Sequence, residues 1–256
     1  MLPDVLKPPS LMSSKRVLCV QPHPDDMECS AGGTIALLAA RGATVVYVTV
    51  TDGAWGAFEP VDPAELAETR RREQVEACQV LGVEEIAWLD FPDGQVPPGS
   101  GHVLCRHLVS LIRSYRPDCV MTVDPWTPYE AHPDHYNTGL AVAAAVLFSG
   151  LAAAHREEGL EPHSPEMVAF AVTTRPNTWV AVDEVWERRT RALEAHRSQF
   201  STPAGEVQKT LLRLQAEELA RRGRAAGKLQ EGVTLAEAFK VLSPLHLHCN
   251  WEAHKC

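Results

Sequence analysis

The chain has 256 residues, of which 45% are hydrophobic and 22% are charged, a composition typical of an ordinary globular protein with room for one large domain. Its net charge of −9 argues against nucleic acid and against an anionic membrane surface as the main partner, because both favour a basic face. No apolar run approaches the ~20 residues that span a bilayer, residues 1–14 have no apolar core of signal-peptide length, and the seven cysteines form no CxxC pair. We therefore expect a cytoplasmic protein with reduced thiols and no membrane or nucleic-acid partner.

Strands and helices are expected to alternate along the first half of the sequence. The expected strands are apolar and rich in β-branched residues, and they cover 15–21, 43–51, 86–89 and 118–123. The expected helices cover 32–41, 63–81, a segment ending near 115, and 135–151. Gly42 and Gly82 follow two of these helices at the position where glycine commonly ends a helix. This alternation is typical of right-handed βαβ units on a parallel sheet.

The second half is less regular. We expect strands at 167–174 and 178–182, and then a helix to residue 196 with Asp183 as its N-cap. A charged helix is expected over 204–224, with four apolar residues on one face: Val207, Leu211, Leu214 and Leu219. Nothing marks a linker between two domains. The sequence therefore predicts one α/β domain over 15–240 with a mostly parallel sheet flanked by helices and a C-terminal strand and helix extension. A loose arm (1–14) and a tail (241–256) would flank it.

Two similar clusters each follow an expected strand: His23-Pro24-Asp25-Asp26 and His132-Pro133-Asp134-His135. In an open α/β sheet, ligands collect beyond the carboxyl ends of the strands, so both clusters are expected to face one crevice. Together they supply a His₂-carboxylate metal site with a spare aspartate and a spare histidine. A metal-activated hydrolase needs that set, which provides three ligands, a base and an acid. The simpler alternative is that the aspartates only cap the helix that follows.

Further motifs accompany the two clusters in order along the chain. They are Met27-Glu28 before Gly33, Arg70 with Glu73, Phe91-Pro92-Asp93-Gly94, residues 195–199 and residues 236–239. This ordered set, over about residues 15–240, resembles the LmbE-like (PIG-L) de-N-acetylase family. The resemblance implies a zinc-dependent enzyme on a Rossmann-like fold that removes the acetyl group from an N-acetylglucosamine-type substrate, a glycoside or conjugate, through a zinc-bound water. It also implies a homo-oligomer, a trimer or hexamer.

The resemblance further implies a role for each matching position. His23, Asp26 and His135 would be the zinc ligands, although a His₂Asp set also accepts other divalent metals. Asp25 would be the general base that deprotonates the water. His132 would stabilise the tetrahedral oxyanion and help to protonate the departing amine.

Four other positions are given supporting roles. By the same resemblance Arg70 and Asp93 would contact sugar hydroxyls, but a structural salt bridge explains such a pair equally well. Glu28 is expected either to orient the imidazole of His23 or to favour a helix N-terminus. Asp134 is expected to hold the metal-binding side chains in position without binding the metal itself.

Several other residues are weaker candidates. Trp55 and Trp126 stand in the loops beside the motifs, where they could stack on a sugar, although packing is the commoner fate of tryptophan. Tyr129 stands one position further back than the tyrosine of some relatives, which makes it a doubtful oxyanion partner. The amides at Gly32-Gly33 lack a dinucleotide-binding spacing but are suited to hold an anionic group. The tail is rich in histidine and cysteine but fits no standard zinc motif: His246, His248, Cys249, His254 and Cys256.

Two alternatives to the deacetylase remain open from the sequence. The same metal site could cleave a thiol conjugate or another amide of an amino sugar. A different class of protein, a non-catalytic sugar-binding scaffold, would keep the fold without turnover. The five intact catalytic positions favour an enzyme.

Overall fold

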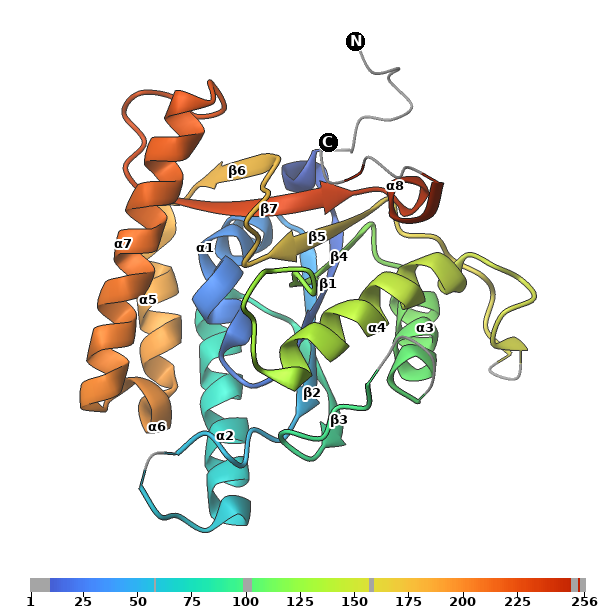
Figure 1. Cartoon of the computed structure of the whole chain (residues 1–256), viewed down its shortest axis with the longest axis horizontal. Helices are drawn as coiled ribbons and strands as arrows, with labels where there is room; N and C mark the ends of the chain where they lie inside the picture. Colours follow the sequence, from blue (N-terminus) through green and yellow to red (C-terminus); the bar gives the residue numbers. More distant parts are fainter. Residues whose placement is uncertain (1–9, 58, 99–102, 157–158, 250–252, 254–256) are drawn as a thin grey trace.

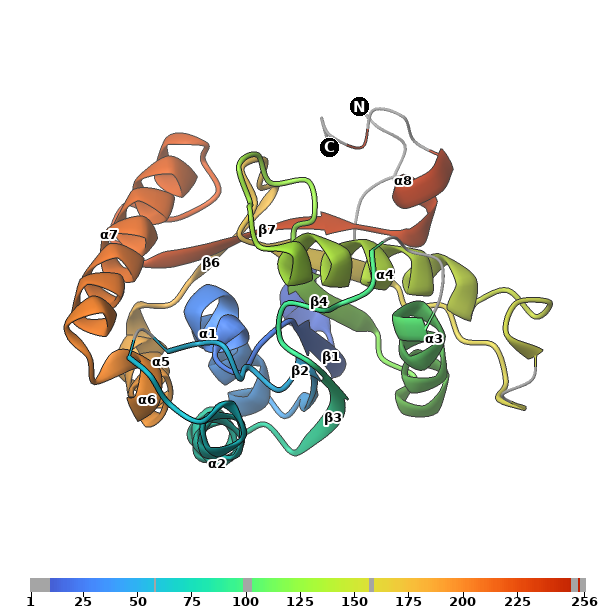
Figure 2. The same cartoon turned by 60° about the horizontal axis from the view of Figure 1, so that its bottom comes forward.

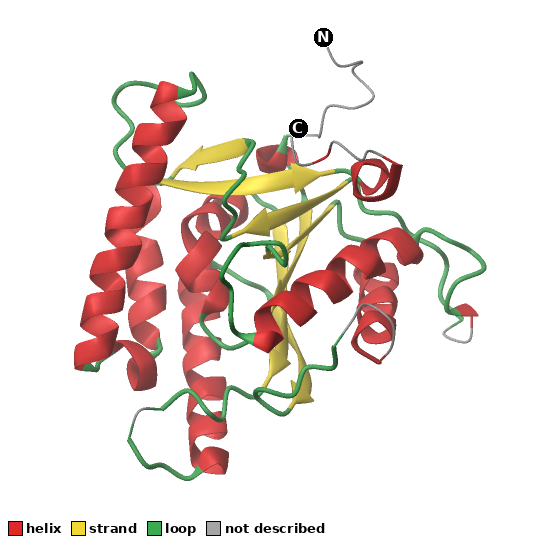
Figure 3. Cartoon of the chain, viewed as in Figure 1, coloured by secondary structure: helices red, strands yellow, loops and turns green. Residues whose placement is uncertain are grey.

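The computed structural model describes residues 10–57, 59–98, 103–156, 159–249 and 253. A central sheet has helices on both faces (Figure 1). Its strands are β1 (Arg16–Gln21), β2 (Thr44–Thr51), β3 (Glu85–Phe91), β4 (Cys119–Val123), β5 (Met167–Ala171), β6 (Thr178–Ala181) and β7 (Ala236–Leu242). Their spatial order is β3-β2-β1-β4-β5-β7-β6. Neighbours from β3 to β5 pair in parallel, and β7 pairs antiparallel with both β5 and β6. The predicted mostly parallel α/β fold is therefore confirmed (Figure 3).

The helices form a layer on each side of the sheet. On one side lie α1 (Asp26–Ala40), α2 (Pro63–Leu81), α5 (Trp186–Ala195) and α7 (Pro203–Ala225). On the other side lie α3 (Val103–Tyr115) and α4 (Pro133–Ser149) (Figures 1 and 2). Short pieces complete the described chain: η2 (Leu11–Ser13), η4 (Asp183–Val185), α6 (Arg197–Phe200) and α8 (Pro244–Cys249). No helix among the described residues combines the length and the apolar character needed to cross a membrane.

The central strands are buried on both faces, which explains their continuous apolar sequence. In β1, Val17 and Cys19 join the core beneath α1, whereas Leu18 and Val20 join the core beneath α3 and α4. Successive side chains of a strand point to opposite faces, so one short apolar run supplies both cores. All cysteines in the described part of the chain are free, as expected for reduced thiols.

Helix α1 begins at Asp26, six residues before the predicted start at Gly32. The two glycines lie inside the helix, where neighbouring side chains pass close to its backbone. A Cβ on Gly32 would lie 2.9 Å from Cγ of Arg189, and one on Gly33 would lie 2.7 Å from Cγ1 of Val182. The glycines therefore mark a close approach between elements and not the beginning of the helix.

The amides around the glycine pair do hold an anionic group, which belongs to the protein itself. The buried carboxylate of Glu237 on β7 accepts hydrogen bonds from the backbone N–H of Gly33 at 2.8 Å and of Thr34 at 2.7 Å. Burial raises the pKa of Glu237, although Thr34 and Arg189 partly offset the effect. The last strand is thus tied to the first helix.

Other boundaries also differ from expectation. Asp183 does not cap α5, because its carboxylate accepts hydrogen bonds from Thr234 and it lies in η4, before the helix begins at Trp186. Strand β7 continues to Leu242, past residue 240, and Leu11 in the expected arm is only 1% exposed. The division into arm, domain and tail stays a prediction.

Candidate functional site

The two His-Pro-Asp clusters meet at the carboxyl ends of adjacent strands. β1 and β4 pair in parallel, with Cys19 opposite Met121, so the loops that follow them leave the same edge of the sheet. The chain passes from β1 to β2 on one side and later to β4 on the other. Crevices for ligands form at such a reversal of strand order in open α/β sheets. A cavity lined by Asp26 of the first cluster and His135 of the second is present, as predicted.

Three predicted ligands form a compact donor set. The ligand atoms of His23, Asp26 and His135 all lie within 4.8 Å of one another. One oxygen of Asp26 lies 3.3 Å from Nδ1 of His23, and the other lies 3.4 Å from Nε2 of His135. Two imidazole nitrogens and one carboxylate are a common protein donor set for Zn²⁺ and related divalent metals. The residues present fit such an ion.

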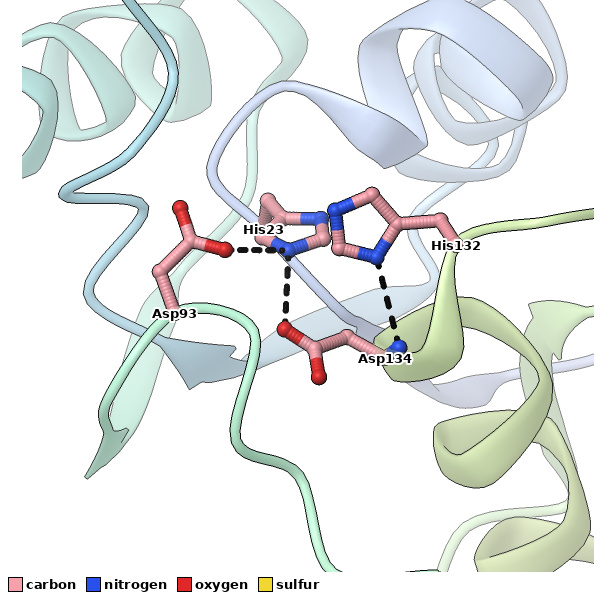
Figure 4. A group of neighbouring side chains, drawn as sticks. All are labelled: His23, Asp93, His132 and Asp134. Carbon is pink, nitrogen blue, oxygen red and sulfur yellow. Dashed lines mark hydrogen bonds and ion pairs between the residues drawn. The ribbon is translucent and has the colours of Figure 1, made fainter.

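The other nitrogen of His23 is held by two carboxylates (Figure 4). Nε2 lies 3.1 Å from Asp93 and 3.2 Å from Asp134, and both carboxylates are buried. Since neither carboxylate can donate a hydrogen bond when ionised, Nε2 carries a proton. This leaves Nδ1, which faces the carboxylate of Asp26, as the nitrogen at which a cation could take the place of a proton. Carboxylates placed in this way orient metal-binding histidines in other proteins.

A second group of metal-binding side chains overlaps the first: His23, Asp93, His132 and Asp134. The two carboxylates of this group already accept hydrogen bonds from backbone amides. Asp134 accepts hydrogen bonds from the N–H of Gly94 and Val96, and Asp93 accepts one from the N–H of Trp55. We therefore take this group as the support of the loops and of His23. Among the residues that the structure describes, no further group of this kind is found.

The charges of the site explain the pKa shifts of its groups. Burial acts to lower the pKa of His23, but Asp134, Asp26 and Asp93 outweigh it and raise the pKa well above its ordinary value. Burial acts to raise the pKa of Asp26, but His135 and His23 lower it below its ordinary value. The imidazoles and carboxylates thus stabilise each other's charges, and a cation could replace the proton of His23.

Asp25, the predicted base, occupies a strained backbone position next to the donor set. Its φ of 96° is uncommon for a residue other than glycine. Its N–H donates to Oε1 of Gln74 at 3.0 Å, and its carboxylate accepts a hydrogen bond from Nη2 of Arg70 at 3.0 Å. Burial raises the pKa of Asp25, although Arg70 and His196 partly offset the effect. Its side chain does not cap α1, which argues against the simple capping alternative.

The predicted sugar contacts, Arg70 and Asp93, are each only 4% exposed. The guanidinium of Arg70 donates to the carbonyls of Pro24 and Gly53 as well as to Asp25. Both residues are therefore occupied in building the site, and their contact with a sugar stays a prediction. Gln74, one turn after Arg70 on α2, was not singled out from the sequence. Its i, i+4 spacing from Arg70 was the available signal.

His132, the predicted oxyanion residue, is stacked on His135 with ring centroids 5.1 Å apart. Its Nδ1 accepts the N–H of Asp134 at 3.3 Å, so the neutral ring carries its proton on Nε2. Burial, followed by the charges of His23 and His135, lowers its pKa. A neutral donor at Nε2 is available to a carbonyl oxygen. Tyr129, in contrast, is fully exposed and does not join this group.

Glu28 lies in a buried polar cluster behind the site. One of its oxygens accepts a hydrogen bond from Nε2 of Gln74 at 3.1 Å, and the other lies 3.5 Å from Nε2 of His196. The expectation that Glu28 orients His23 is wrong, because Asp93 and Asp134 make that contact. Helix α2 brings Gln74 between Glu28 and the His-Pro-Asp loop, which the sequence alone did not indicate.

The remaining candidates lie at the rim or elsewhere. Trp55 is largely exposed and covers Gly94, where a Cβ would lie 2.4 Å from its ring. Trp126 packs edge-on against Phe170. In the tail, His246 is buried and contacts Ser243. His254 and Cys256 lie outside the described residues.

The chain is similar to known proteins in sequence and in fold. Residues 18–146 match the family model described as GlcNAc-PI de-N-acetylase, PIG-L. The chain is 40% identical over 203 residues to diacetylchitobiose deacetylase of Thermococcus kodakarensis, covering 78% of this chain and 75% of that protein. It is 31% identical over 191 residues to a probable N-acetyl-α-D-glucosaminyl L-malate deacetylase 2 of Bacillus cereus, covering 72% and 84%. The structure of N,N'-diacetylchitobiose deacetylase from Pyrococcus horikoshii superimposes with a TM-score of 0.84 at 35% identity, covering 92% of this chain and 86% of that one.

Proposed function

Because the chain belongs to the GlcNAc-PI de-N-acetylase (PIG-L) family, we propose that it is a metal-dependent hydrolase that removes the acetyl group from an N-acetylglucosamine-type substrate. The observation that carries this proposal is the meeting of His23, Asp26 and His135, whose ligand atoms lie within 4.8 Å of one another. Asp25 and His132 flank this set from the two loops. The named relatives are deacetylases of amino-sugar compounds, which supports the same bond as the target.

His23, Asp26 and His135 would hold Zn²⁺, which when bound polarises an amide carbonyl and lowers the pKa of water to about 7. Asp25 accepts the proton of the attacking water, and Arg70 holds its carboxylate in position. His132 directs its Nε2 proton at the carbonyl oxygen, where negative charge develops in the transition state, and helps to protonate the amine that leaves as the C–N bond breaks. The buried Asp93 and Asp134 keep His23 in the tautomer that a ligand needs.

The finer features remain part of the proposal. A substituted N-acetylglucosamine is the substrate class, with a thiol conjugate or another amino-sugar amide as the alternative within the same chemistry. A cytoplasmic homo-oligomer, trimer or hexamer, is expected from the family resemblance. A non-catalytic sugar-binding scaffold is the alternative from another class, and the complete catalytic set argues against it.

The test is metal content by elemental analysis, combined with amine release from N-acetylglucosamine derivatives before and after chelation. We expect about one metal per chain and release that chelation abolishes. His135→Ala should lose metal and activity together, whereas Asp25→Asn should keep the metal and lose activity. Hydrolysis that persists in a metal-free Asp25→Asn protein would refute the proposal. Metal without any amine release would favour another amide, and sugar binding without turnover would favour the scaffold.

A further inference from the structure

Helix α7 packs against the protein through small residues and leaves two of its four leucines exposed. Ala216, Ala220 and Gly223 are buried, whereas Leu211 and Leu214 are 52% and 54% exposed. An amphipathic helix normally buries its leucine face. The exposed apolar face of α7 is therefore expected to contact a ligand or another protein surface.

This face forms one wall of a cavity that begins at the candidate metal site. The cavity has a volume of about 650 Å³, and it extends from Asp26 and His135 to Leu211 and Leu214. Helix α7 stands beside β6 and β7 at the edge of the molecule (Figure 2). Ligand sites of drug size span about 300–1,000 Å³. The space thus exceeds what a single amino sugar needs.

The cavity changes in character along its length. Ser30, Thr127 and Glu130 line it beside the metal ligands, whereas α7 contributes four leucines to its wall, together with Gln208, Gln215, Glu218 and Arg222. Sugar hydroxyls suit the first part and a hydrocarbon group suits the second.

A strained residue completes the apolar part. Val172, after β5, has a φ of 55° and is 52% exposed, although a β-branched residue rarely adopts the left-handed region. Its carbonyl accepts a hydrogen bond from Oγ1 of Thr127 at 2.6 Å, which fixes it to the loop that carries His132. Val172 lines the same cavity as Leu211. Backbone strain that the surroundings hold in place is commonest at ligand sites.

We propose that this cavity is a subsite for an apolar aglycone, so that the preferred substrate is an N-acetylglucosamine glycoside whose anomeric substituent is a hydrocarbon. The proposal rests on the proposed function, because the sugar must present its acetamide to the metal ligands. The polar end holds the sugar ring, and Val172, Leu211 and Leu214 contact the hydrocarbon.

The experiment compares two substrates with the metal-loaded enzyme: the methyl and the octyl β-glycosides of N-acetylglucosamine, the latter below its micelle concentration. We expect KM for the octyl glycoside to be at least about tenfold lower, as burial of a few methylene groups would produce. Leu211→Gln should bring the ratio of the two KM values close to one. Val207→Gln is the matched control, because Val207 is an exposed apolar residue of the same helix outside the cavity lining, and it should preserve the ratio.

Several results would overturn the subsite. Equal KM values for the two glycosides would overturn it. So would a KM ratio that changes by the same factor in Leu211→Gln and in Val207→Gln. A preference for N-octanoylglucosamine that Leu211→Gln abolishes would place the chain on the acyl side. Loss of an oligomer in Leu211→Gln by light scattering would show that a second copy covers the leucines. Leu214→Gln repeats the test should Leu211→Gln fail to fold.

Failure of the proposed function gives a different result. In that case neither glycoside releases an amine. Calorimetric titration of octyl β-glucoside into the unmodified protein, Leu211→Gln and Val207→Gln then decides the subsite alone. Binding that only Leu211→Gln weakens would support it, and no binding to the unmodified protein would overturn it.

Discussion

Gln74 accepts the backbone N–H of Asp25 at 3.0 Å, so a side chain of α2 holds the left-handed turn that carries the proposed base. The same Oε1 accepts a hydrogen bond from Nε2 of Gln21 at 2.8 Å, and Oε1 of Gln21 accepts the N–H of Met27. The two glutamines therefore connect both ends of the His-Pro-Asp turn to the sheet and to α2. A backbone strained in this way persists only where its surroundings determine it.

Replacing Gln74 by Leu should lower kcat by about ten- to a hundredfold, because a small displacement of a catalytic group has effects of that size. The metal content should stay the same, since none of the hydrogen bonds that the structure shows for Gln74 reaches His23, Asp26 or His135. The measurement is steady-state kinetics with metal analysis, and KM should change little. Val75→Ala, at an exposed position next to it on α2, is the control and should keep kcat. Unchanged kcat in Gln74→Leu would show that the turn does not need this bond.

Gly33→Ala should lower the free energy of unfolding by about 1–3 kcal/mol, the cost of overpacking a filled site. The added methyl would lie 2.7 Å from Val182 and 3.0 Å from the carboxylate of Glu237. Chemical denaturation measures the effect. Gly232→Ala has open space around the new Cβ and should stay within about 0.5 kcal/mol of the unmodified protein. Equal stability of the two variants would refute the close approach.

Arg113→Lys should destabilise the protein by about 2–3 kcal/mol, because an ammonium cannot replace a guanidinium that serves several acceptors. The buried guanidinium of Arg113 donates to four carbonyls at and after the end of α4: Ser149, Leu151, Ala154 and His155. Arg41 is exposed, and Arg41→Lys is the control, which should change stability by less than about 0.5 kcal/mol. Thermal unfolding compares the two, and a neutral Arg113→Lys would contradict the expectation.

Asp183 should add stability that acid removes. Burial acts to raise its pKa, but hydrogen bonds from the hydroxyl and the amide of Thr234 outweigh it and lower the pKa below its ordinary value. Since the folded-state pKa is below the unfolded-state value of about 3.9, the contribution is complete above that value and is lost as the pH falls through the folded-state pKa. Asp183→Asn should therefore be less stable at neutral pH and converge with the unmodified protein in acid. Thr234→Val should likewise be less stable at neutral pH and converge with the unmodified protein in acid. Stability that differs from that of the unmodified protein by the same amount at every pH would disprove the link between Asp183 ionisation and stability.

Elements with strong local signals could be predicted from the sequence. Helix α2 runs over Pro63–Leu81 as expected, because Asp62 caps its start and Gly82, at a φ of 82°, ends it. The buried strands β1, β2 and β4 lie within one residue of expectation at each end, since their continuous apolar sequences are unambiguous. The two clusters could be placed together because both follow parallel strands.

Features that depend on distant contacts could not be predicted. The backbone N–H of Gly33 and its carboxylate acceptor Glu237 are 204 positions apart in the sequence. The place of β7 between β5 and β6 is likewise set by pairing and not by its own sequence. Spacing placed Arg70 on α2 but did not indicate that its guanidinium points inward to Asp25. The role of Glu28 was misjudged for the same reason.

The insertion of β7 fixes the order in which the molecule can be completed during synthesis. Residues 18–146, which match the family and carry the proposed ligands, leave the ribosome long before Ala236. Until that strand arrives, β5 has one open edge, β6 lacks the strand with which it pairs, and the amides of Gly33 and Thr34 lack the carboxylate that they bind. A nascent chain stalled before Ala236 would therefore hold the residues of its reaction centre on an unfinished sheet, a form that chaperones and proteases can distinguish from the finished protein.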